Sequence, residues 1–452
     1  MKIIIVGLGK VGMTLAAELC DEENDVTVID RREEIIEEAT DQYDLMGITG
    51  NGASHSTQVE AGVEDADLLI AVTGSDEMNL LCCLMAKDAG KCHSIARVRN
   101  PEYNSEIGFI HDKFRLSMII NPDLAAATEI ARNLKFPSAI DVDSFAKNRV
   151  DILKFRVREQ SALDGIRIAD LSAKVKGNIL ICAVERGEQL IIPDGNTVLK
   201  TRDLVSIVSG SNDANQFFHQ IGIVSNQARS ILIVGGSPLA YYLTRMLIAT
   251  GMRVKIIEKD LKRCEELSEM LPKATIVHGD GTEKELLLEE GIEEYDSFAA
   301  LTNIDEENIL ISLYAKKIGG QKKIITKINR IAFDEVIQEL DLDTVIHPRD
   351  IMAEMIIRYA RSMKNTFGSN VETLHKIING KAEALEFIIR GQSRVTDKTL
   401  QELPIRKGIL VGCIYRHGKI IIPGGSDRMQ IGDSVIIVTQ EKGLEDIEDI
   451  LL

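Results

Sequence analysis

Short apolar runs alternate with amphipathic stretches over the first part of the chain. The apolar runs predict β-strands near residues 2–6, 26–29, 45–48, 68–72 and 94–98. The stretches between them have a helical period and predict helices near residues 10–20, 31–40, 55–61 and 76–89. Apolar strands separated by helices indicate βαβ units, so we expect an α/β fold with a Rossmann-like parallel sheet that is buried on both faces.

A different pattern follows in residues 150–225, where apolar runs are separated by turn residues such as those at 193–196. This pattern is typical of a small α+β domain with hairpins. Between the two parts, Asn121 is a good helix N-cap and Pro122 suits a first helical turn. A connecting helix is therefore expected from Pro122 to about residue 134.

The whole arrangement occurs twice. The segment IIIVG at residues 3–7 returns as ILIVG at 231–235, and AVTGSDEMNLL from Ala71 returns as ALTNIDEENIL from Ala300, with 6 of 11 residues identical. Equivalent positions stay between 226 and 230 residues apart. Chance matches would not remain collinear over this length, so the sequence predicts two tandem copies of one two-part unit.

The repeat divides the chain into six expected segments. Each copy has a Rossmann-like domain, a connecting helix with a linker, and a small α+β domain. The expected bounds are 1–121, 122–149 and 150–225 in the first copy and 228–347, 348–370 and 371–452 in the second, with the link between the copies at 222–229.

Composition narrows the class of protein. The chain has 452 residues, of which 44% are hydrophobic, enough for several cores, and its net charge is −17 with neither half basic. This balance argues against a dedicated nucleic-acid binder and against electrostatic attachment to anionic lipid. No apolar run approaches the roughly 20 residues that span a bilayer, and the start lacks a signal-peptide pattern, so a cytoplasmic location is expected. The seven cysteines form no CxxC motif and are expected to be reduced, buried thiols.

The glycine loop of the first copy, Gly7-Leu8-Gly9-Lys10-Val11-Gly12, matches the dinucleotide pattern G-x-G-x-x-G between an expected strand and an expected helix. Gly7 allows the tight turn, Gly9 lets a pyrophosphate approach, and Gly12 lets the helix pack closely. The helix N-terminus offers N–H donors to phosphate. Asp30 can accept hydrogen bonds from ribose hydroxyls and repels a 2′-phosphate, which favours NAD(H) over NADP(H). A glycine turn without a ligand is the alternative.

Further loops are expected at the same edge, because ligands of such folds lie beyond the carboxyl ends of the strands. An adenine edge, ribose or phosphate could meet these loops. Thr73 and Asp76 could equally well cap a helix instead of contacting a ligand. Arg97 and Arg99 could equally well form surface ion pairs. The candidate residues are Asn51, Gly52, Thr73, Gly74, Arg97 and Arg99, with Arg31 beside Asp30. Arg31 and Arg32 could alternatively counter the repulsion of a 2′-phosphate by Asp30, or simply face solvent.

The glycine loop of the second copy departs from the pattern. It reads Gly235-Gly236-Ser237-Pro238-Leu239-Ala240, so a serine replaces the close-approach glycine and a proline removes one N–H from the helix start. Glu258 keeps the place of the ribose acceptor. We expect the second copy to bind a nucleotide more weakly, to take a different nucleotide such as ATP or ADP, or to stay empty.

Residues for catalysis are not evident. None of the eight histidines has a repeated role, and the chain shows neither a nucleophile elbow nor a Cys/His metal spacing. A duplicated nucleotide fold without catalytic residues indicates a sensor rather than an enzyme, with no metal site and no catalytic residue.

Together these features resemble the TrkA family of regulatory subunits of Trk-type potassium uptake. The resemblance is carried by MKIIIVGLGKVG with Asp30, by the two segments from Ala71 and Ala300, by NPD at 121–123 and by the turns IIPDG and IIPGG, and it covers essentially the whole chain. It implies RCK (regulator of potassium conductance) N-domains without hydride transfer, and RCK C-domains after them. It also implies connecting helices that cross between neighbouring N-domains, although their apolar residues, Leu124, Ile130, Leu134, Ile351, Met355 and Ile356, fit an ordinary core equally well.

The resemblance implies a set of nucleotide-binding positions in each copy. In the first copy they are Gly7 to Val11, Asp30, Asn51, Gly52, Thr73 and Arg97. In the second copy they are Gly235 to Leu239, Glu258, Asp280, Gly281, Thr302 and Lys327.

The sequence therefore predicts a non-enzymatic gating subunit that binds NAD(H) in its first copy and, in its second, ATP, ADP or a more weakly held nucleotide. Its expected partners are a TrkH-like membrane potassium transporter subunit, which would hold it on the cytoplasmic face of the membrane, and further copies of itself in a ring, expected to be a tetramer. Two alternatives remain: an NAD-dependent oxidoreductase, and a nucleotide-binding scaffold without a membrane partner.

Overall fold

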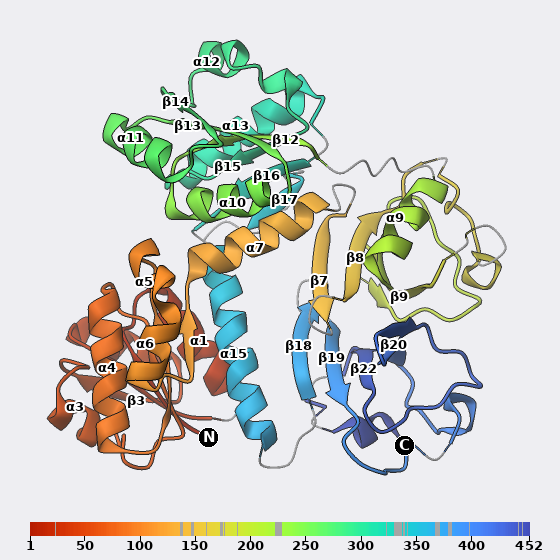
Figure 1. The fold of residues 1–452 in the computed structure, drawn as a ribbon. Helices are drawn as coiled ribbons and strands as arrows, with labels where there is room; N and C mark the ends of the chain where they lie inside the picture. The colour runs from red at the N-terminus through yellow and green to blue at the C-terminus, as the bar shows by residue number, and fades with distance from the viewer. Residues whose placement is uncertain are drawn as a thin grey trace. The chain divides into compact units, whose positions relative to one another are not determined.

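The chain packs into two compact units, and each unit combines parts of both copies: Met1–Ala131 with Ser230–Ala360, and Arg132–Arg229 with Arg361–Leu452. The first parts of the two copies therefore form one unit, and their second parts form the other (Figure 1). None of the helices in the described part of the chain combines the length and apolarity needed to cross a membrane. This computed structural model describes all residues except 23, 136–138, 146–148, 160, 172–174, 176, 188, 222–227, 322, 330–336, 338–339, 341, 367–370, 378–381, 397, 442 and 445.

The first copy begins with a six-stranded sheet in the order β3-β2-β1-β4-β5-β6, in which neighbouring strands are parallel. Ile3, Ile4 and Ile5 of the central strand are almost completely buried, as expected for a sheet covered on both faces. The strands are β1 (Lys2–Val6), β2 (Asp25–Asp30), β3 (Met46–Thr49), β4 (Leu68–Ala71), β5 (His93–Arg97) and β6 (Met118–Ile120). The helices are α1 (Lys10–Asp21), α2 (Glu33–Gln42), α3 (His55–Glu60), α4 (Asp76–Ala89), α5 (Pro101–Ser105) and α6 (Ile107–Phe114).

The second copy repeats this sheet in the order β14-β13-β12-β15-β16-β17, again with parallel neighbours. The expected α/β class with two Rossmann-like sheets is therefore confirmed. The strands are β12 (Ser230–Val234), β13 (Arg253–Glu258), β14 (Thr275–His278), β15 (Ser297–Ala300), β16 (Lys323–Lys327) and β17 (Thr344–Ile346). The helices are α10 (Pro238–Ala249), α11 (Leu261–Met270), α12 (Lys284–Glu289), η2 (Ile292–Glu294) and α13 (Asp305–Ile318).

The segment from Val98 to Asn121 contains three elements that the pattern of apolar residues did not predict: α5, α6 and β6. Helix α5 begins at Pro101, and the side chain of Asn100 accepts a hydrogen bond from the amide of Glu102 over 2.9 Å. Strand β6 has only three residues and lies at the edge of the sheet. So short an apolar run becomes a strand only because β5 supplies hydrogen bonds beside it.

The second unit contains the two small parts, each with a five-stranded antiparallel sheet. Their strand orders, β10-β9-β11-β8-β7 and β18-β19-β22-β20-β21, are equivalent in reverse. Strand β7 lies within the segment expected to be a linker, so this sheet begins before residue 150. The first sheet has β7 (Asp141–Phe145), β8 (Val150–Arg156), β9 (Ile179–Arg186), β10 (Gln189–Ile191) and β11 (Leu204–Ser209), with η1 (Ile168–Asp170) and α9 (Ser211–Gln220). The second has β18 (Val371–Ile377), β19 (Ala382–Ile388), β20 (Ile409–Arg416), β21 (Lys419–Ile421) and β22 (Ser434–Thr439), with η3 (Leu400–Glu402) and η4 (Ile447–Ile450).

Residues of both antiparallel sheets form one buried apolar cluster in the second unit, which includes Cys182 from one copy and Cys413 from the other. Burial raises the pKa of each of these two thiols to about 12, so both stay protonated at neutral pH. The seven cysteines are free, and all but Cys20 are buried, as the sequence predicted.

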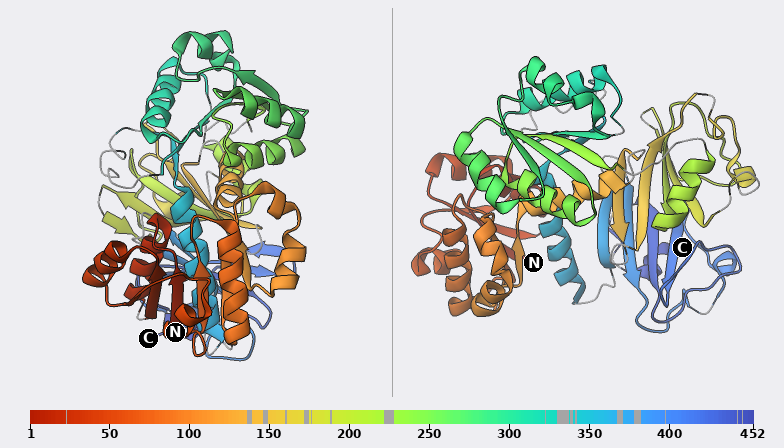
Figure 2. Two further views of the ribbon diagram at one scale, coloured as in Figure 1. Left: turned by 90° about the vertical axis from the view of Figure 1, so that its left-hand side faces the viewer. Right: turned by 45° about the horizontal axis from the view of Figure 1, so that its top comes forward.

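The connecting helices α7 (Pro122–Lys135) and α15 (Pro348–Thr366) join the two Rossmann-like domains of the first unit. Helix α7 lies against the second of these domains and α15 against the first (Figures 1 and 2). Asn121, just before α7, donates a hydrogen bond to the Tyr242 hydroxyl over 3.0 Å, and Tyr359 of α15 lies 3.0 Å from Nδ1 of His93. Ile130 and Ile356 are completely buried. The helices thus serve both as core and as the exchanged contact between the copies.

The link expected at 222–229 lies outside the described residues, except for Ala228 and Arg229.

Candidate functional site

The glycine loop of the first copy connects β1 to α1 and takes the shape that its three glycines permit. Gly7 has a φ of +96°, which strongly favours glycine. A Cβ on Gly12 would lie 1.9 Å from the carbonyl oxygen of Gly7, so only glycine lets α1 approach the strand this closely. A Cβ on Gly9 would meet nothing within 4 Å. Gly9 therefore borders open space, while Gly7 and Gly12 shape the turn.

Asp30, at the end of β2, is tied to this loop. One carboxylate oxygen accepts a hydrogen bond from the amide of Leu8 over 2.7 Å, and the other accepts one from the amide of Arg32 over 3.0 Å. The Arg32 guanidinium lies 3.1 Å from the same carboxylate. Burial raises the pKa of Asp30, but the hydrogen bonds from Arg32 and Leu8 outweigh it and hold that pKa below its ordinary value. Asp30 is therefore an ionised acceptor at the mouth of the loop.

These residues border a cleft of about 710 Å³, which we call the first cleft. It lies at the carboxyl ends of β1 and β4, where the strand order reverses and ligands of such sheets bind. Eleven candidate residues of the first copy line it: Gly7, Gly9, Lys10, Val11, Asp30, Arg31, Asn51, Gly52, Thr73, Gly74 and Arg97. Gly12 lies behind the loop instead, and Leu8 lines a smaller adjoining hollow.

Asn51 and Arg31 close one side of the first cleft. The Arg31 guanidinium donates to the side-chain oxygen of Asn51 over 3.1 Å, so Arg31 does not simply face solvent. Gly52 lies behind them, and a Cβ there would come within 2.1 Å of Val6. The role of Gly52 is thus close packing against β1, and Asn51 is the member of this loop with a polar group at the cleft.

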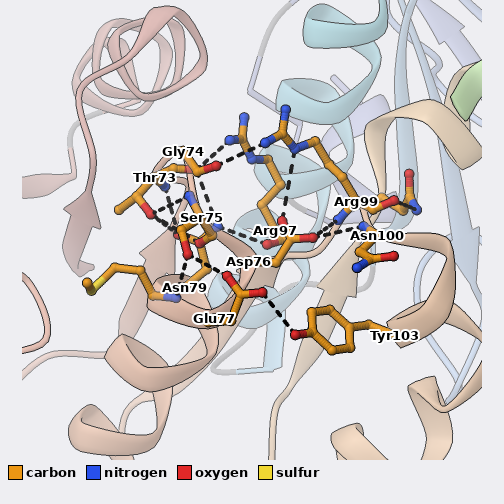
Figure 3. Close-up of polar contacts among 12 residues, drawn as sticks. Thr73, Gly74, Ser75, Asp76, Glu77, Asn79, Arg97, Arg99, Asn100 and Tyr103 are labelled. Carbon is orange, nitrogen blue, oxygen red and sulfur yellow. Dashed lines mark hydrogen bonds and ion pairs between the residues drawn. The ribbon is translucent and has the colours of Figure 1, made fainter. Parts of the chain in front are cut away.

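The loop after β4 is held by Asn79 of α4, which is fully buried (Figure 3). Its side-chain oxygen accepts hydrogen bonds from the amide and the hydroxyl of Thr73, both over 2.7 Å, and its nitrogen donates to the carbonyl of Arg97 over 2.9 Å. Ser75 caps α4 by accepting from the amide of Met78 over 3.2 Å. The Thr73 hydroxyl is therefore used inside the protein, although Thr73 borders the cleft.

Asp76 binds the start of the next loop rather than capping α4. One of its carboxylate oxygens accepts hydrogen bonds from the amides of Arg99 and Asn100, both over 2.8 Å (Figure 3). The Arg99 guanidinium donates to the carbonyl of Gly74 over 2.9 Å. Asp76 thus joins the ends of β4 and β5, and Arg99 fastens the loop instead of reaching the cleft.

Arg97 is a partly buried cation that lines the first cleft. Burial lowers its pKa to about 10, so it stays charged at neutral pH. Its guanidinium donates to the carbonyl of Thr73, but its Nε is buried without a hydrogen-bond partner among the described residues. A buried cationic donor that lacks an acceptor fits an anionic ligand in this cleft.

The second copy builds the same frame around a cleft of about 500 Å³, the second cleft. Asn308 repeats the role of Asn79, with the amide of Thr302 donating over 3.0 Å and its hydroxyl over 2.8 Å. The candidates Gly235, Gly236, Ser237, Pro238, Glu258, Asp280, Gly281 and Thr302 line this cleft. Leu239 is completely buried, and the amine of Lys327 reaches Asn303 over 3.2 Å rather than lining the cleft.

The helix starts in the two clefts differ in what they offer a ligand. At α1 the N-cap is Gly9, which has no side chain to occupy the first amides of the helix. At α10, Pro238 lacks an N–H, and the hydroxyl of Ser237 accepts from the amide of Ala240 over 3.4 Å. The start of α1 therefore keeps free donors for a phosphate, whereas α10 satisfies part of its own start.

The charges in the two clefts also differ. The first cleft is lined by five cationic side chains, among them Lys10 and Arg97, and by one carboxylate, Asp30. The second is lined by two cationic side chains and four carboxylates. One of these, Asp280, binds the amine of Lys259 over 2.5 Å, and that bond leads the effects that lower its pKa to about 2. Of these two clefts in a chain with a net charge of −17, the first is the one with an excess of positive charge, which attracts anions.

Several residues that line the clefts were not predicted from the sequence. Met78 and Ser75 line the first cleft because α4 begins there, and Lys259, Arg263 and Glu307 line the second. These residues follow strands or begin helices, and such positions lie at the cleft edge of a parallel sheet, so their place in the sequence could have indicated that they line the clefts. Arg349 also lines the first cleft, although it belongs to the second copy. The sequence of one copy alone could not place Arg349 in the first cleft, because Arg349 reaches this cleft only when the two copies exchange their connecting helices.

Fold and clefts together define a duplicated α/β protein of the Rossmann-like type whose first cleft is lined mainly by cations. Family models agree in detail: the TrkA-N domain matches residues 3–122 and 231–348, and the TrkA-C domain matches residues 152–222 and 385–452. The chain belongs to the TrkA family of potassium uptake proteins.

Relatives and solved structures support this assignment. The chain is 34% identical over 450 residues to "Trk system potassium uptake protein TrkA homolog" from Archaeoglobus fulgidus, covering 100% of both chains. It is 33% identical over 456 residues to "Trk system potassium uptake protein TrkA homolog 1" from Methanosarcina mazei, covering 99% of each. The structure "GsuK channel bound to NAD" matches with a TM-score of 0.62 at 17% identity, over 98% of this chain and 77% of that one, which shows a shared fold. The chain thus belongs with components of potassium transport and not with enzymes.

Proposed function

We propose that this chain is a nucleotide-responsive regulatory subunit of a Trk-type potassium uptake system, with NAD(H) held in the first cleft. The excess of cationic side chains around the open helix start at Gly9 carries this proposal, because it matches a pyrophosphate. The Nε of Arg97, which has no hydrogen-bond partner in the described part of the chain, adds a donor for phosphate. Asp30 accepts from the ribose, sharing its oxygens with Arg32. The structurally similar GsuK channel, solved bound to NAD, supports the choice of ligand.

The second cleft is proposed as a weak or empty site. Its carboxylates repel phosphate, and Ser237 and Pro238 reduce the donors at its helix start. Any nucleotide it takes, such as ATP or ADP, binds there more weakly than NAD(H) binds in the first cleft.

The proposed partners follow from the family. The names of the relatives refer to a potassium uptake system, so we propose a TrkH-like membrane subunit as the partner that holds this chain on the cytoplasmic face of the membrane. A ring of identical chains, proposed as a tetramer, would transmit the state of the first cleft to that subunit. Binding of nucleotide would favour one arrangement of the Rossmann-like domains over another.

Calorimetric titration of NADH into the full-length chain tests the proposal, with Asp30→Asn as the site variant and Glu258→Asn as its counterpart in the second copy. We expect binding that weakens about tenfold or more in Asp30→Asn and stays unchanged in Glu258→Asn. Equal binding by Asp30→Asn would remove Asp30 from the site. Recovery of the chain from native membranes without any potassium transporter would contradict the proposed partner.

A further inference from the structure

Arg349 belongs to the second copy but borders the first cleft. It is the second residue of α15, and it lines the first cleft and the adjoining hollow, both of which also contain Gly9 and Lys10. Its side chain is half-buried. Among the described residues it has no hydrogen-bond or ion-pair partner. Arg349 thus lies beside the start of α1 in the first cleft, and it shares the adjoining hollow with two carboxylates, Glu18 and Glu38.

The stability of α15 does not explain this arginine. The N-terminus of a helix carries partial positive charge, so a cation in the first turn is unfavourable and an acid is favourable. At the equivalent position of the first copy, the motif Asn121-Pro122-Asp123 supplies the acid that α7 prefers, whereas α15 has Arg349 there and its first-turn acid, Asp350, one residue later. The presence of an arginine at this position is therefore better explained by its place beside the first cleft.

The exchange of helices places these two opposite charges in opposite copies. Asp123, at the start of α7, interacts electrostatically with Lys327 of the second copy as well as with Arg97 and Arg99 of its own. Arg349, at the start of α15, lines the first cleft together with Gly9 and Lys10 of the first copy. Arg349 thus adds a cation of the second copy to the first cleft, whereas Asp123 lies among cations of both copies and lines neither cleft.

We propose that Arg349 is a ligand for the phosphates of a nucleotide in the first cleft, so that the second copy completes the binding site of the first. This inference rests on the proposed function, because it needs a nucleotide there. A guanidinium can donate two parallel hydrogen bonds to a phosphate, and the amides at the start of α1 approach the same group from the other side. A nucleoside diphosphate or dinucleotide bound here joins α15 to α1, whereas a nucleoside without phosphate does not.

The test compares three ligands by calorimetry on the full-length chain: NAD, ADP and adenosine. For Arg349→Gln we expect NAD and ADP to bind about 10- to 100-fold more weakly and adenosine to be unaffected, with partial recovery in Arg349→Lys. Lys284→Gln is the matched control, because it removes a charge from an exposed position of the same copy that borders neither cleft. Equal affinity of wild type and Arg349→Gln for NAD and ADP would overturn the inference.

A second measurement separates contact from general stability. Hydrogen exchange at the start of α15 should slow when ADP is added to the wild type, but neither when adenosine is added nor when ADP is added at saturation to Arg349→Gln. Equal protection in the variant would overturn the inference even if the affinities differed. If the wild type binds none of the three ligands, the proposed function itself fails. If Asp30→Asn loses binding while Arg349→Gln keeps it, only the inference about Arg349 fails.

Discussion

Asn79 offers a sharp test of how the first cleft is built, because one buried side chain holds two strand ends together. Replacing it with alanine removes three short hydrogen bonds of 2.7, 2.7 and 2.9 Å, two from Thr73 and one to Arg97, and a longer one of 3.4 Å to the carbonyl of Thr73. Each is worth about 1 to 1.5 kcal/mol, more where the partner stays buried and unpaired. Alanine returns about 0.5 kcal/mol as the better helix former. We therefore expect Asn79→Ala to lower the free energy of unfolding by about 3 kcal/mol.

The repeat supplies the matched control. Asn308 makes the equivalent bonds to Thr302 and Lys327 in the second copy, so Asn308→Ala should destabilise the chain by a similar amount. Only Asn79→Ala should also weaken NADH binding, because only it frees the loop that borders the first cleft. Urea unfolding followed by circular dichroism measures the stability, since the chain has no tryptophan. A loss below about 1 kcal/mol in both variants would refute the reasoning.

Three further predictions separate roles within the first cleft. Gly12→Ala should destabilise the chain by about 1 to 3 kcal/mol in urea unfolding, since its Cβ would strike Gly7, whereas Gly9→Ala should keep the stability and lose NADH affinity in calorimetry. Because the pKa of Asp30 is lowered, its contribution to NADH binding should stay constant from about pH 8 to pH 5 and fall only as the pH drops through that lowered value; titrations that decline near pH 6 would contradict this. Calorimetry at saturating NADH should give one tightly bound equivalent per chain, and two equal sites would contradict the assigned weakness of the second cleft.

Much of the fold was readable from the sequence, because strands such as Ile3–Val6 are apolar throughout and lie between amphipathic helices. The duplication was readable for the same reason. The small elements between β5 and α7 were not, since β6 has only three residues at a sheet edge and depends on its neighbour. The pattern of apolar residues also placed β7 in a linker. In the structure, residues Asp141 to Phe145 of β7 pair with β8 in an antiparallel arrangement.

At the site, the glycine loop and Asp30 were predictable because each answers a local requirement of the turn or of a ligand. The roles of Thr73 and Asp76 were not, since hydroxyl and carboxylate groups serve capping, loop bracing and ligand contact equally well in a sequence. The structure shows that the residues shared by the two copies here, such as Asn79 and Asn308, brace the loop. The excess of carboxylates in the second cleft was also not predicted, because residues such as Asp280 and Glu307 are far apart along the chain.

The covalent linkage of the two exchanging domains has a consequence for symmetry. In a dimer of identical chains, a two-fold axis would force the same residue onto both exchanged helices, so both clefts would gain the same charge. Here Asp123 and Arg349 occupy related places and differ in sign. Fusion into one polypeptide frees the two faces to diverge, and a single molecule can thereby carry a mainly cationic cleft in one copy and a mainly acidic cleft in the other.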